Sequence, residues 1–211
     1  MRFRDRTDAG RQLAACLADY VNRPDVIVLG LPRGGVVVAA EVASTLNAPL
    51  DVWLVRKLGV PGQPELAMGA VAPGGVEIHN DDLVHALQIP PAAIHEVAAR
   101  ERAELERRAS AYRGSRAAPS LHDKRAILVD DGLATGATME AAVAAARQLH
   151  PREVVVAVPV GARETVERIG RVADRTVVLE APAEFRAVGH WYDDFTQTTD
   201  DEVRRLVGGH S

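Results

Sequence analysis

Cysteine is almost absent from this chain of 211 residues, which contains Cys16 alone. A lone cysteine excludes an internal disulfide, and the seven histidines are scattered without the spacing of zinc ligands, so we predict no zinc site. Cys16 falls on the apolar face of a helix expected over about residues 8–21, together with Leu13, Leu17 and Tyr20. This position predicts a buried, reduced thiol rather than a reactive nucleophile.

Long apolar runs are also missing, and no segment is long enough to span a bilayer. Residues 1–8 read MRFRDRTD, so they are charged and lack the apolar core of a signal peptide. We therefore expect no membrane partner and a cytoplasmic location.

Positive charge is not in excess either, because the formal net charge is −4. A chain without a broad basic surface is not expected to bind nucleic acid. Two common phosphate-binding motifs are absent too: no Gly-x4-Gly-Lys-Ser/Thr occurs, and no Gly-x-Gly-x-x-Gly follows an expected strand. These absences argue against a P-loop and against a dinucleotide-binding fingerprint.

Hydrophobic residues make up 47% of the chain, which is enough to build the core of one folded domain. Strands are expected near residues 26–31, 51–56, 67–72, 125–130, 153–159 and 176–180, and helices near 8–21, 36–46, 137–149, 162–171 and 200–207. This alternation predicts an α/β fold with a Rossmann-like, mostly parallel sheet flanked by helices. We expect a single domain over residues 1–211, with a C-terminal hood-like segment at about 183–207.

An insert at about residues 81–113 breaks the alternation, and after Pro90-Pro91 it is typical of one long helix. Its apolar stripe consists of Ile94, Val97, Ala98, Leu105, Ala109 and Tyr112. Its charged side predicts a solvated, ion-paired face rather than an RNA-binding patch, and consists of Arg100, Arg102, Arg107, Arg108, Glu96, Glu101, Glu104 and Glu106. The helix could form a hood over a site or a dimer contact.

The most informative stretch lies at residues 126–139, which read AILVDDGLATGATM. A short apolar strand ends in Asp130 and Asp131, and a loop of glycine, alanine and threonine then opens a helix. In an open α/β sheet such a loop lies where ligands bind, and it directs free backbone N–H groups at an anion. Capping alone would explain a lone Asp-Asp-Gly, but it does not require Thr135, Thr138 and two glycines. The stretch therefore offers donors for a phosphate beside carboxylates that accept from hydroxyls, as a sugar phosphate requires.

This stretch resembles the phosphoribosyl diphosphate (PRPP) signature of type I phosphoribosyltransferases. The resemblance implies that Asp130 and Asp131 hold the ribose hydroxyls and are central to catalysis. It implies that the following loop wraps the 5-phosphate with its backbone N–H groups and threonine hydroxyls. That loop consists of Gly132, Ala134, Thr135, Gly136, Ala137 and Thr138.

A second stretch, at residues 25–39, reads DVIVLGLPRGGVVVA and places Pro-Arg-Gly-Gly between a strand and an apolar helix. Alone it could be an ordinary turn. The resemblance places the pyrophosphate-binding loop here, with Arg33 as a charged fork and with Gly34 and Gly35 allowing close approach. It also places a cis peptide bond in this loop, for which Pro32–Arg33 is the candidate.

A third stretch, at residues 51–66, reads DVWLVRKLGVPGQPEL. We expect a strand that ends in Arg56 and Lys57, followed by a mobile loop that closes over the pyrophosphate. By resemblance, Arg56 and Lys57 neutralise the leaving group, and Lys57 is the catalytic candidate of the two. The alternative is a solvated strand edge with two exposed cations.

The aromatic cluster at residues 185–195 reads FRAVGHWYDDF. Family members that use purines carry a similar late segment, which stacks the base and approaches the metal. The resemblance makes Phe185, Val188, Trp191 and Tyr192 candidates for acceptor binding and Asp193 a candidate near the metal. Each aromatic side chain could equally be a core or interface anchor.

The resemblance implies an enzyme that binds PRPP and Mg²⁺ and transfers the phosphoribosyl group to a nitrogenous base or related acceptor, releasing pyrophosphate. Some purine-using relatives have an acid where this chain has Ala134. The acceptor therefore cannot be named, and the 6-oxopurine assignment is weakened. Relatives are commonly dimers, so a homodimer is expected.

Two alternatives stay open. A PRPP-sensing regulator would keep the fold with little turnover, although this sequence lacks a clear basic surface for RNA or DNA. A phospho-acceptor receiver domain also has strands that end in acids. Its acid pair lies on the first strand, whereas the pair here comes late and carries a Thr-Gly-x-Thr loop.

Overall fold

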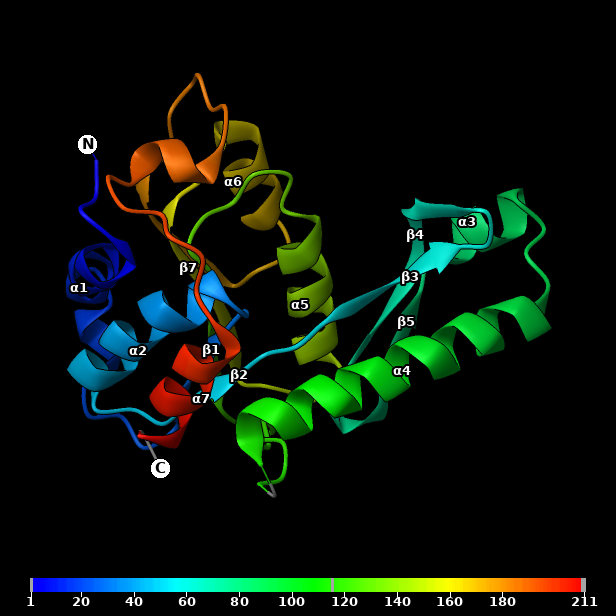
Figure 1. Ribbon diagram of the computed structural model, residues 1–211, viewed down its shortest axis with the longest axis horizontal. Coiled ribbons are helices and arrows are strands. Elements are labelled where there is room, and N and C mark those ends of the chain that lie inside the picture. The colour runs from blue at the N-terminus through cyan, green and yellow to red at the C-terminus, as the bar shows by residue number, and fades with distance from the viewer. Residues whose placement is uncertain (1, 115, 210–211) are drawn as a thin grey trace.

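The central sheet of the molecule has five parallel strands in the order β2-β1-β6-β7-β8 (Figure 1). The computed structural model describes residues 2–114 and 116–209, with the backbone alone at residue 65. The strands are β1 (Val26–Gly30), β2 (Leu50–Val52), β6 (Arg125–Val129), β7 (Glu153–Val160) and β8 (Arg175–Glu180). The predicted α/β fold with a mostly parallel sheet is confirmed.

Helices cover both faces of this sheet, with α1 (Arg6–Ala15) and α2 (Gly34–Leu46) on one side and α5 (Ala137–Arg147) on the other (Figure 1). Side chains of β1 alternate between the two layers: Val26 and Val28 pack with α1 and α2, whereas Ile27 and Leu29 pack with α5. Strands buried on both faces are continuous apolar runs, which is why they were predictable. The short helix α6 (Arg163–Ile169) joins β7 to β8.

A second sheet of three antiparallel strands stands beside the core. Its strands are β3 (Arg56–Val60), β4 (Gln63–Ala72) and β5 (Val76–His79), with the 3₁₀ turn η2 (Pro73–Gly75) before β5. The prediction of a mobile loop after Lys57 is wrong, because β3 and β4 form a hairpin. Pro61 and Gly62 make its turn, in which Gly62 has a φ of 80° and Pro-Gly is a favoured turn pair.

The predicted strand at 51–56 is also corrected, because β2 ends at Val52 and Arg56 and Lys57 begin β3. The residues between them turn away from the parallel sheet. Trp53 is buried there, and its indole nitrogen donates to the carbonyl oxygen of Ala142 at 3.1 Å. This bond and the packing of Trp53 against α5 redirect the chain toward the second sheet.

The insert contains α3 (Asp81–Ala86) and the long helix α4 (Pro91–Arg113), as the Pro90-Pro91 pattern predicted. Val97, Leu105 and Tyr112 of its apolar stripe are buried against the second sheet and the terminal helix α7 (Asp200–Gly208). Figure 1 shows α4 running from the core to the second sheet. Glu101 and Glu104 form the expected ion pairs with arginines of the same helix.

The first helix ends earlier than predicted, and this reverses the environment of Cys16. Helix α1 stops at Ala15, and a 3₁₀ turn η1 (Ala18–Tyr20) follows. Leu13, Leu17 and Tyr20 are buried as expected, but Cys16 caps the helix and is exposed. The predicted burial of this thiol is therefore wrong, because the helical spacing does not continue beyond α1. Within the described residues, no helix is long and apolar enough to cross a membrane.

Candidate active site

Three strands of the parallel sheet end level with one another. Gly30 at the end of β1 is paired with Val52 of β2 and with Val129 of β6. The residues that follow these three strands therefore emerge at the same edge of the sheet. Each of the three predicted motifs continues there. Chain order reverses at β1, which lies between β2 and β6, and such a switch point opens a crevice for ligands.

The acid pair lies in this crevice in a partly buried environment. Asp130 Oδ1 accepts the backbone N–H of Asp131 at 2.8 Å, and Asp131 Oδ2 accepts from Nε of Arg6 at 2.7 Å. Burial raises the pKa of Asp130 well above its ordinary value, and the charge of Asp131 raises it further. Burial also raises the pKa of Asp131, although Arg6 opposes the shift. The two carboxyl groups thus lie side by side in a partly buried position, where their oxygens can accept hydrogen bonds from hydroxyl groups.

Arg6 is a site residue that the sequence reasoning missed. Asp5 caps α1 by accepting from the backbone N–H of Asp8, which places Arg6 at the first helical position. The Arg6 side chain is 11% exposed, and its guanidinium lies 3.9 Å from the ring centroid of Phe195. Arg6 and Asp131 are separated by 125 positions, so no local pattern could have indicated the pair.

The predicted phosphate loop has its N–H groups free and its carbonyls engaged. In the described part of the chain, no acceptor takes the amide N–H groups of residues 134–138. On the other side, Thr165 Oγ1 donates to the carbonyl of Ala134 at 2.8 Å, and Arg168 donates to that of Thr135. Successive free amides at the start of α5 form a concave anion site.

Gly136 shapes this loop because its φ is 74° and a Cβ there would lie 2.4 Å from Thr165 Cγ2. The hydroxyl-bearing residues Thr135 and Thr138 are exposed beside it. The structure therefore brings the predicted loop and the acid pair together on one edge.

The Pro-Arg-Gly-Gly segment packs directly against the acid pair. A Cβ at Gly34 would lie 1.9 Å from Asp131 Oδ2, and a Cβ at Gly35 would lie 2.8 Å from the Cα of Asp130. Only glycine fits at such distances. The peptide bond Pro32–Arg33 is cis, as predicted.

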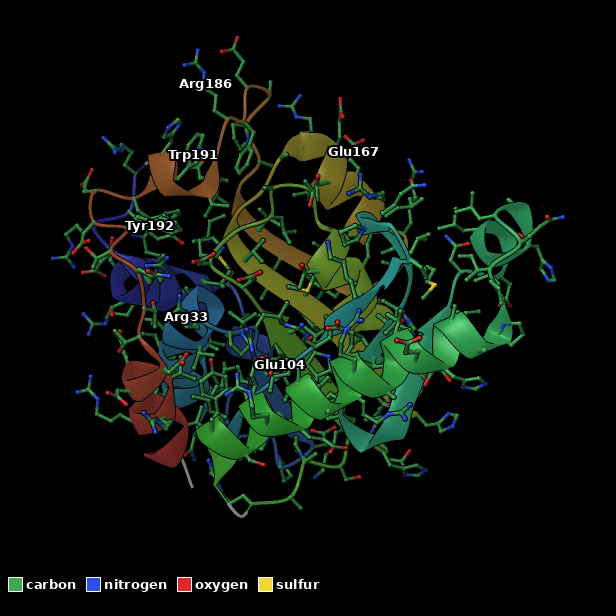
Figure 2. The ribbon with its side chains drawn as sticks, turned by 45° about the vertical axis from the view of Figure 1, so that its right-hand side comes forward. Arg33, Glu104, Glu167, Arg186, Trp191 and Tyr192 are labelled. Atoms are coloured by element: carbon green, nitrogen blue, oxygen red, sulfur yellow. The ribbon has the colours of Figure 1, made fainter. Side chains whose placement is uncertain are left out.

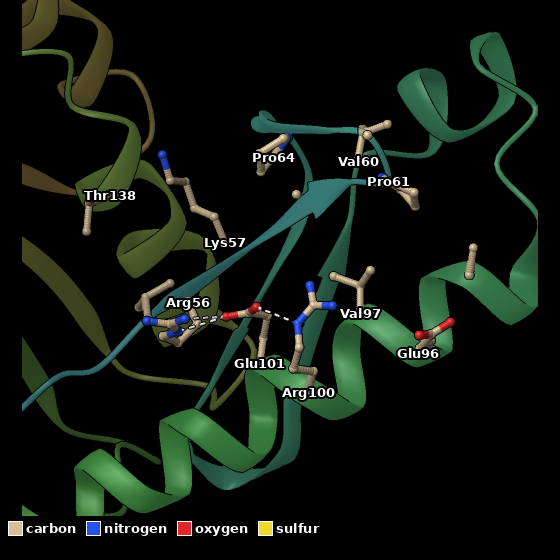
Figure 3. A pocket seen from close by; sticks show the side chains of 14 residues that line it. Arg56, Lys57, Val60, Pro61, Pro64, Glu96, Val97, Arg100, Glu101 and Thr138 are labelled. Atoms are coloured by element: carbon tan, nitrogen blue, oxygen red, sulfur yellow. Dashed lines mark hydrogen bonds and ion pairs between the residues drawn. The ribbon is translucent and has the colours of Figure 1, made fainter.

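The two basic residues of β3 have different surroundings. Arg56 donates from Nε and Nη2 to Glu101 of α4 at 2.9 and 2.5 Å, whereas exposed Lys57 has no ion-pair partner among the described residues. Both line a cavity of about 640 Å³ that Thr138 also reaches (Figure 3). The positive charge of Lys57 is thus available to a ligand near the phosphate loop.

The late aromatic segment closes the other side of the crevice. Tyr192 is 2% exposed, packs with Phe3 and donates its hydroxyl to the carbonyl of Asp131 at 2.6 Å. This burial favours the core alternative for Tyr192. Trp191 lies beside it above α1 (Figure 2), in the 3₁₀ turn η3 (Val188–Trp191).

The other predicted residues of this segment lie around that core. Phe185, Val188 and Trp191 are partly buried, and Val188 contacts Gly132 so closely that a Cβ there would lie 2.6 Å from its methyl group. Asp193 has a side chain that is 59% exposed, and its carboxylate lies 3.4 Å from Arg2 Nε. Within the described residues, no group of three or more metal-binding side chains occurs.

Comparison with known proteins identifies the family. The phosphoribosyl transferase domain model matches residues 4–191, and the chain belongs to this family, as its motifs predicted. A protein of Mycobacterium tuberculosis (strain H37Rv), provisionally named as a phosphoribosyl transferase, is 52% identical over 201 residues, which are 95% of this chain and 45% of that protein. The chain thus spans less than half the length of that relative.

Solved structures agree on the fold. The TT1426 protein from Thermus thermophilus is 47% identical, with a TM-score of 0.89 over 100% of both chains. The AQ2163 protein from Aquifex aeolicus is 14% identical, with a TM-score of 0.53 over 96% of this chain and 85% of its own. The latter likeness shows the fold alone.

Proposed function

We propose that the protein binds PRPP with magnesium and transfers its phosphoribosyl group to a nitrogenous base or related acceptor, releasing pyrophosphate. In this proposal Asp130 and Asp131 accept from the ribose hydroxyls, and the amides of residues 134–138 bind the 5-phosphate with Thr135 and Thr138. The observation that carries it is the row of unpaired amides beside a partly buried acid pair. That combination matches the two ends of a sugar phosphate.

The proposed chemistry follows from the charges that develop. When the bond from ribose C1 to pyrophosphate breaks, the sugar becomes cationic and the leaving group gains negative charge. Arg33, Arg56 and Lys57 stabilise that negative charge, while the acid pair holds the ribose in place. Gly34 and Gly35 let the pyrophosphate approach the backbone.

Magnesium fits this donor set. The ion typically takes one or two carboxylates plus substrate phosphates and keeps several waters, so a cage of protein ligands is not needed. Asp130 and Asp131 can supply the carboxylates, and Asp193 stays a prediction as a further group near the metal. Bound magnesium would neutralise charge on the pyrophosphate.

The acceptor is proposed to lie near Val188 and Gly132, where Phe185 and Trp191 remain partly exposed. Ala134 stands where some purine-using relatives have an acid, so a base that needs no such partner fits better. The expected homodimer and cytoplasmic location remain predictions, and sedimentation of the purified protein would test the first.

Calorimetric titration of PRPP with magnesium tests the proposal. The wild-type protein should bind, and Asp130→Asn/Asp131→Asn should lose binding while remaining folded. Asp19→Asn/Asp123→Asn is the matched control, because it removes the same charge from side chains that are 79% and 85% exposed. No binding by folded wild-type protein would end the proposal.

A turnover assay distinguishes a phosphoribosyltransferase from a PRPP-sensing regulator. A panel of purine and pyrimidine bases, added with PRPP and magnesium, should release pyrophosphate with at least one member. Tight PRPP binding without pyrophosphate release from any base would favour the PRPP-sensing alternative.

A further inference from the structure

A second cavity, of about 380 Å³, adjoins the pyrophosphate loop and is rich in arginine. Arg33 lines it from the loop after β1, Arg56 lines it from β3, and Arg107 and Arg108 line it from α4. Thr138 of the phosphate loop belongs to the same wall. Four arginines from three separate segments thus line one space beside the proposed substrate site.

The acids that pair with these arginines lie mostly outside the cavity lining. Glu104 accepts from Nε of Arg107 at 2.7 Å and from Nε of Arg108 at 2.8 Å. Figure 2 shows Arg33 beside α2 and Glu104 on α4. These two arginines hold the pKa of Glu104 down to about 2, so its carboxylate stays charged at neutral pH.

Asp200 is the acid that lines the cavity itself. Its carboxylate lies 4.0 Å from Arg33 Nη1 and accepts from the hydroxyl of Tyr112 at 2.7 Å. The lining of this space thus holds four arginines and one acid, while Glu101 and Glu104, outside the lining, pair with Arg56 and with Arg107 and Arg108.

We propose that Arg107 and Arg108 of the insert helix form part of the pyrophosphate site, and that they bind the diphosphate arm of PRPP together with Arg33 and Arg56. This inference rests on the proposed function. Guanidinium forks match phosphate oxygens in pairs, so several arginines around one cavity suit a diphosphate better than a single phosphate. The insert thereby becomes a substrate-binding element.

Glu104 acts as an internal competitor in this arrangement. It occupies donors of both arginines in the free protein, and a bound diphosphate has to share or replace those contacts. Glu104→Gln removes the competing charge and keeps the side-chain shape. This variant is expected to bind inorganic pyrophosphate more tightly than the wild type.

The test compares Arg107→Ala/Arg108→Ala with the control Arg102→Ala/Arg152→Ala. The lost side chains are 67% and 46% exposed in the first variant, and 42% and 63% in the second. Neither control residue lines this cavity. Calorimetry with inorganic pyrophosphate, PRPP and ribose 5-phosphate, each with magnesium, follows a check of folding by circular dichroism.

The double variant should bind pyrophosphate and PRPP about tenfold to a hundredfold more weakly, since charged hydrogen bonds are lost. It should bind ribose 5-phosphate as the wild type does, and the control should match the wild type throughout. If wild-type protein binds PRPP and the double variant binds it equally well, the inference is wrong and the proposed function stands. If wild-type protein binds none of the three ligands, the proposed function itself fails. Should the double variant not fold, Arg108→Ala against Arg102→Ala decides in the same way.

Discussion

At the residue scale, the acid pair shows how a proposed binding group can oppose folding. Burial and mutual repulsion raise the pKa of Asp130, which means that its charged form is disfavoured in the folded protein. The backbone N–H of Asp131 and the guanidinium of Arg6 offset part of this effect. Ribose hydroxyls would supply the remaining donors, so the site is better satisfied with ligand than without it.

We expect Asp130→Asn to stabilise the free protein at pH 8. Because the folded pKa is raised, the contribution of Asp130 is fully present below the unfolded pKa, near 3.8, and is lost as pH rises through the folded pKa. Asparagine keeps the oxygen that accepts from the Asp131 N–H and cannot ionise. The gain should be on the order of 1 kcal/mol.

Urea denaturation of both proteins at pH 8 and pH 4 measures this difference. The gain should shrink at pH 4, because the raised pKa of Asp130 leaves its carboxyl more protonated there than at pH 8. A variant that is less stable than wild type at pH 8 would contradict the assigned direction of the pKa shift.

Gly34→Ala is expected to reduce PRPP affinity about tenfold or more. The new Cβ would lie 1.9 Å from Asp131 Oδ2 and 2.7 Å from Arg6 Nε, so the carboxylate has to move and its charged hydrogen bonds weaken. Gly208→Ala is the control, because among the described residues nothing beyond its chain neighbours and its own helix backbone lies within 4 Å of the added Cβ. Equal PRPP affinity of both variants in calorimetry would show that PRPP binding does not depend on the position of the Asp131 carboxylate.

Features that depend on adjacent residues were predictable from the sequence, and features that depend on distant ones were not. The strand, acid pair and phosphate loop at residues 126–139 form one local pattern, whereas the cis bond at Pro32–Arg33 was expected from the family resemblance alone. Arg6 reaches Asp131 only because the fold joins α1 to the sheet edge. Cys16 was misplaced because the helix was expected to continue to about residue 21, whereas it ends at Ala15.

At the element scale, the hairpin and α4 show a similar division. The apolar stripe and Pro90-Pro91 predicted α4, because helical spacing is a strong local signal. The β3–β4 hairpin was taken for a loop, although Pro61-Gly62 is a good turn pair between Val60 and Gln63. Basic residues and prolines obscured the alternation of buried side chains in β3.

A buried arginine fixes the end of α4 to the parallel sheet. Arg113 has a side chain that is 3% exposed, and it donates to Asp51 Oδ1 at 2.7 Å and to the carbonyl of Val52 at 2.5 Å. Arg113→Met leaves Asp51 without this partner in a partly buried position. Breaking a buried pair in this way typically costs about 3–5 kcal/mol.

Urea denaturation gives the loss directly. Arg204→Met is the control, because it breaks a pair whose side chains are 51% and 77% exposed, and it should change stability by less than about 0.5 kcal/mol. A loss below about 1 kcal/mol for Arg113→Met would show that the packing of α4, rather than this ion pair, holds the helix end.

At the scale of the whole molecule, the candidate site joins both ends of the chain. Distant parts of the chain converge on one edge of the sheet. They are Arg6 from α1, the segments after β1 and β6, β3 of the second sheet, and Tyr192 near the C-terminus. The unfolded chain cannot reproduce this arrangement. A ligand that binds there should therefore bind the folded protein alone and stabilise it as a unit.

We expect PRPP with magnesium, at a free concentration one hundred times its Kd, to raise the free energy of unfolding by about 2.7 kcal/mol. For a chain of 211 residues this corresponds to a rise in Tm of roughly 5–10 °C. Thermal unfolding with and without ligand measures the shift, using the Kd from calorimetry. Asp130→Asn/Asp131→Asn should show no shift at the same concentration, whereas Asp19→Asn/Asp123→Asn should show all of it. An equal shift in the acid-pair variant would place the bound ligand elsewhere, since only a site built on Asp130 and Asp131 makes stabilisation depend on those two side chains.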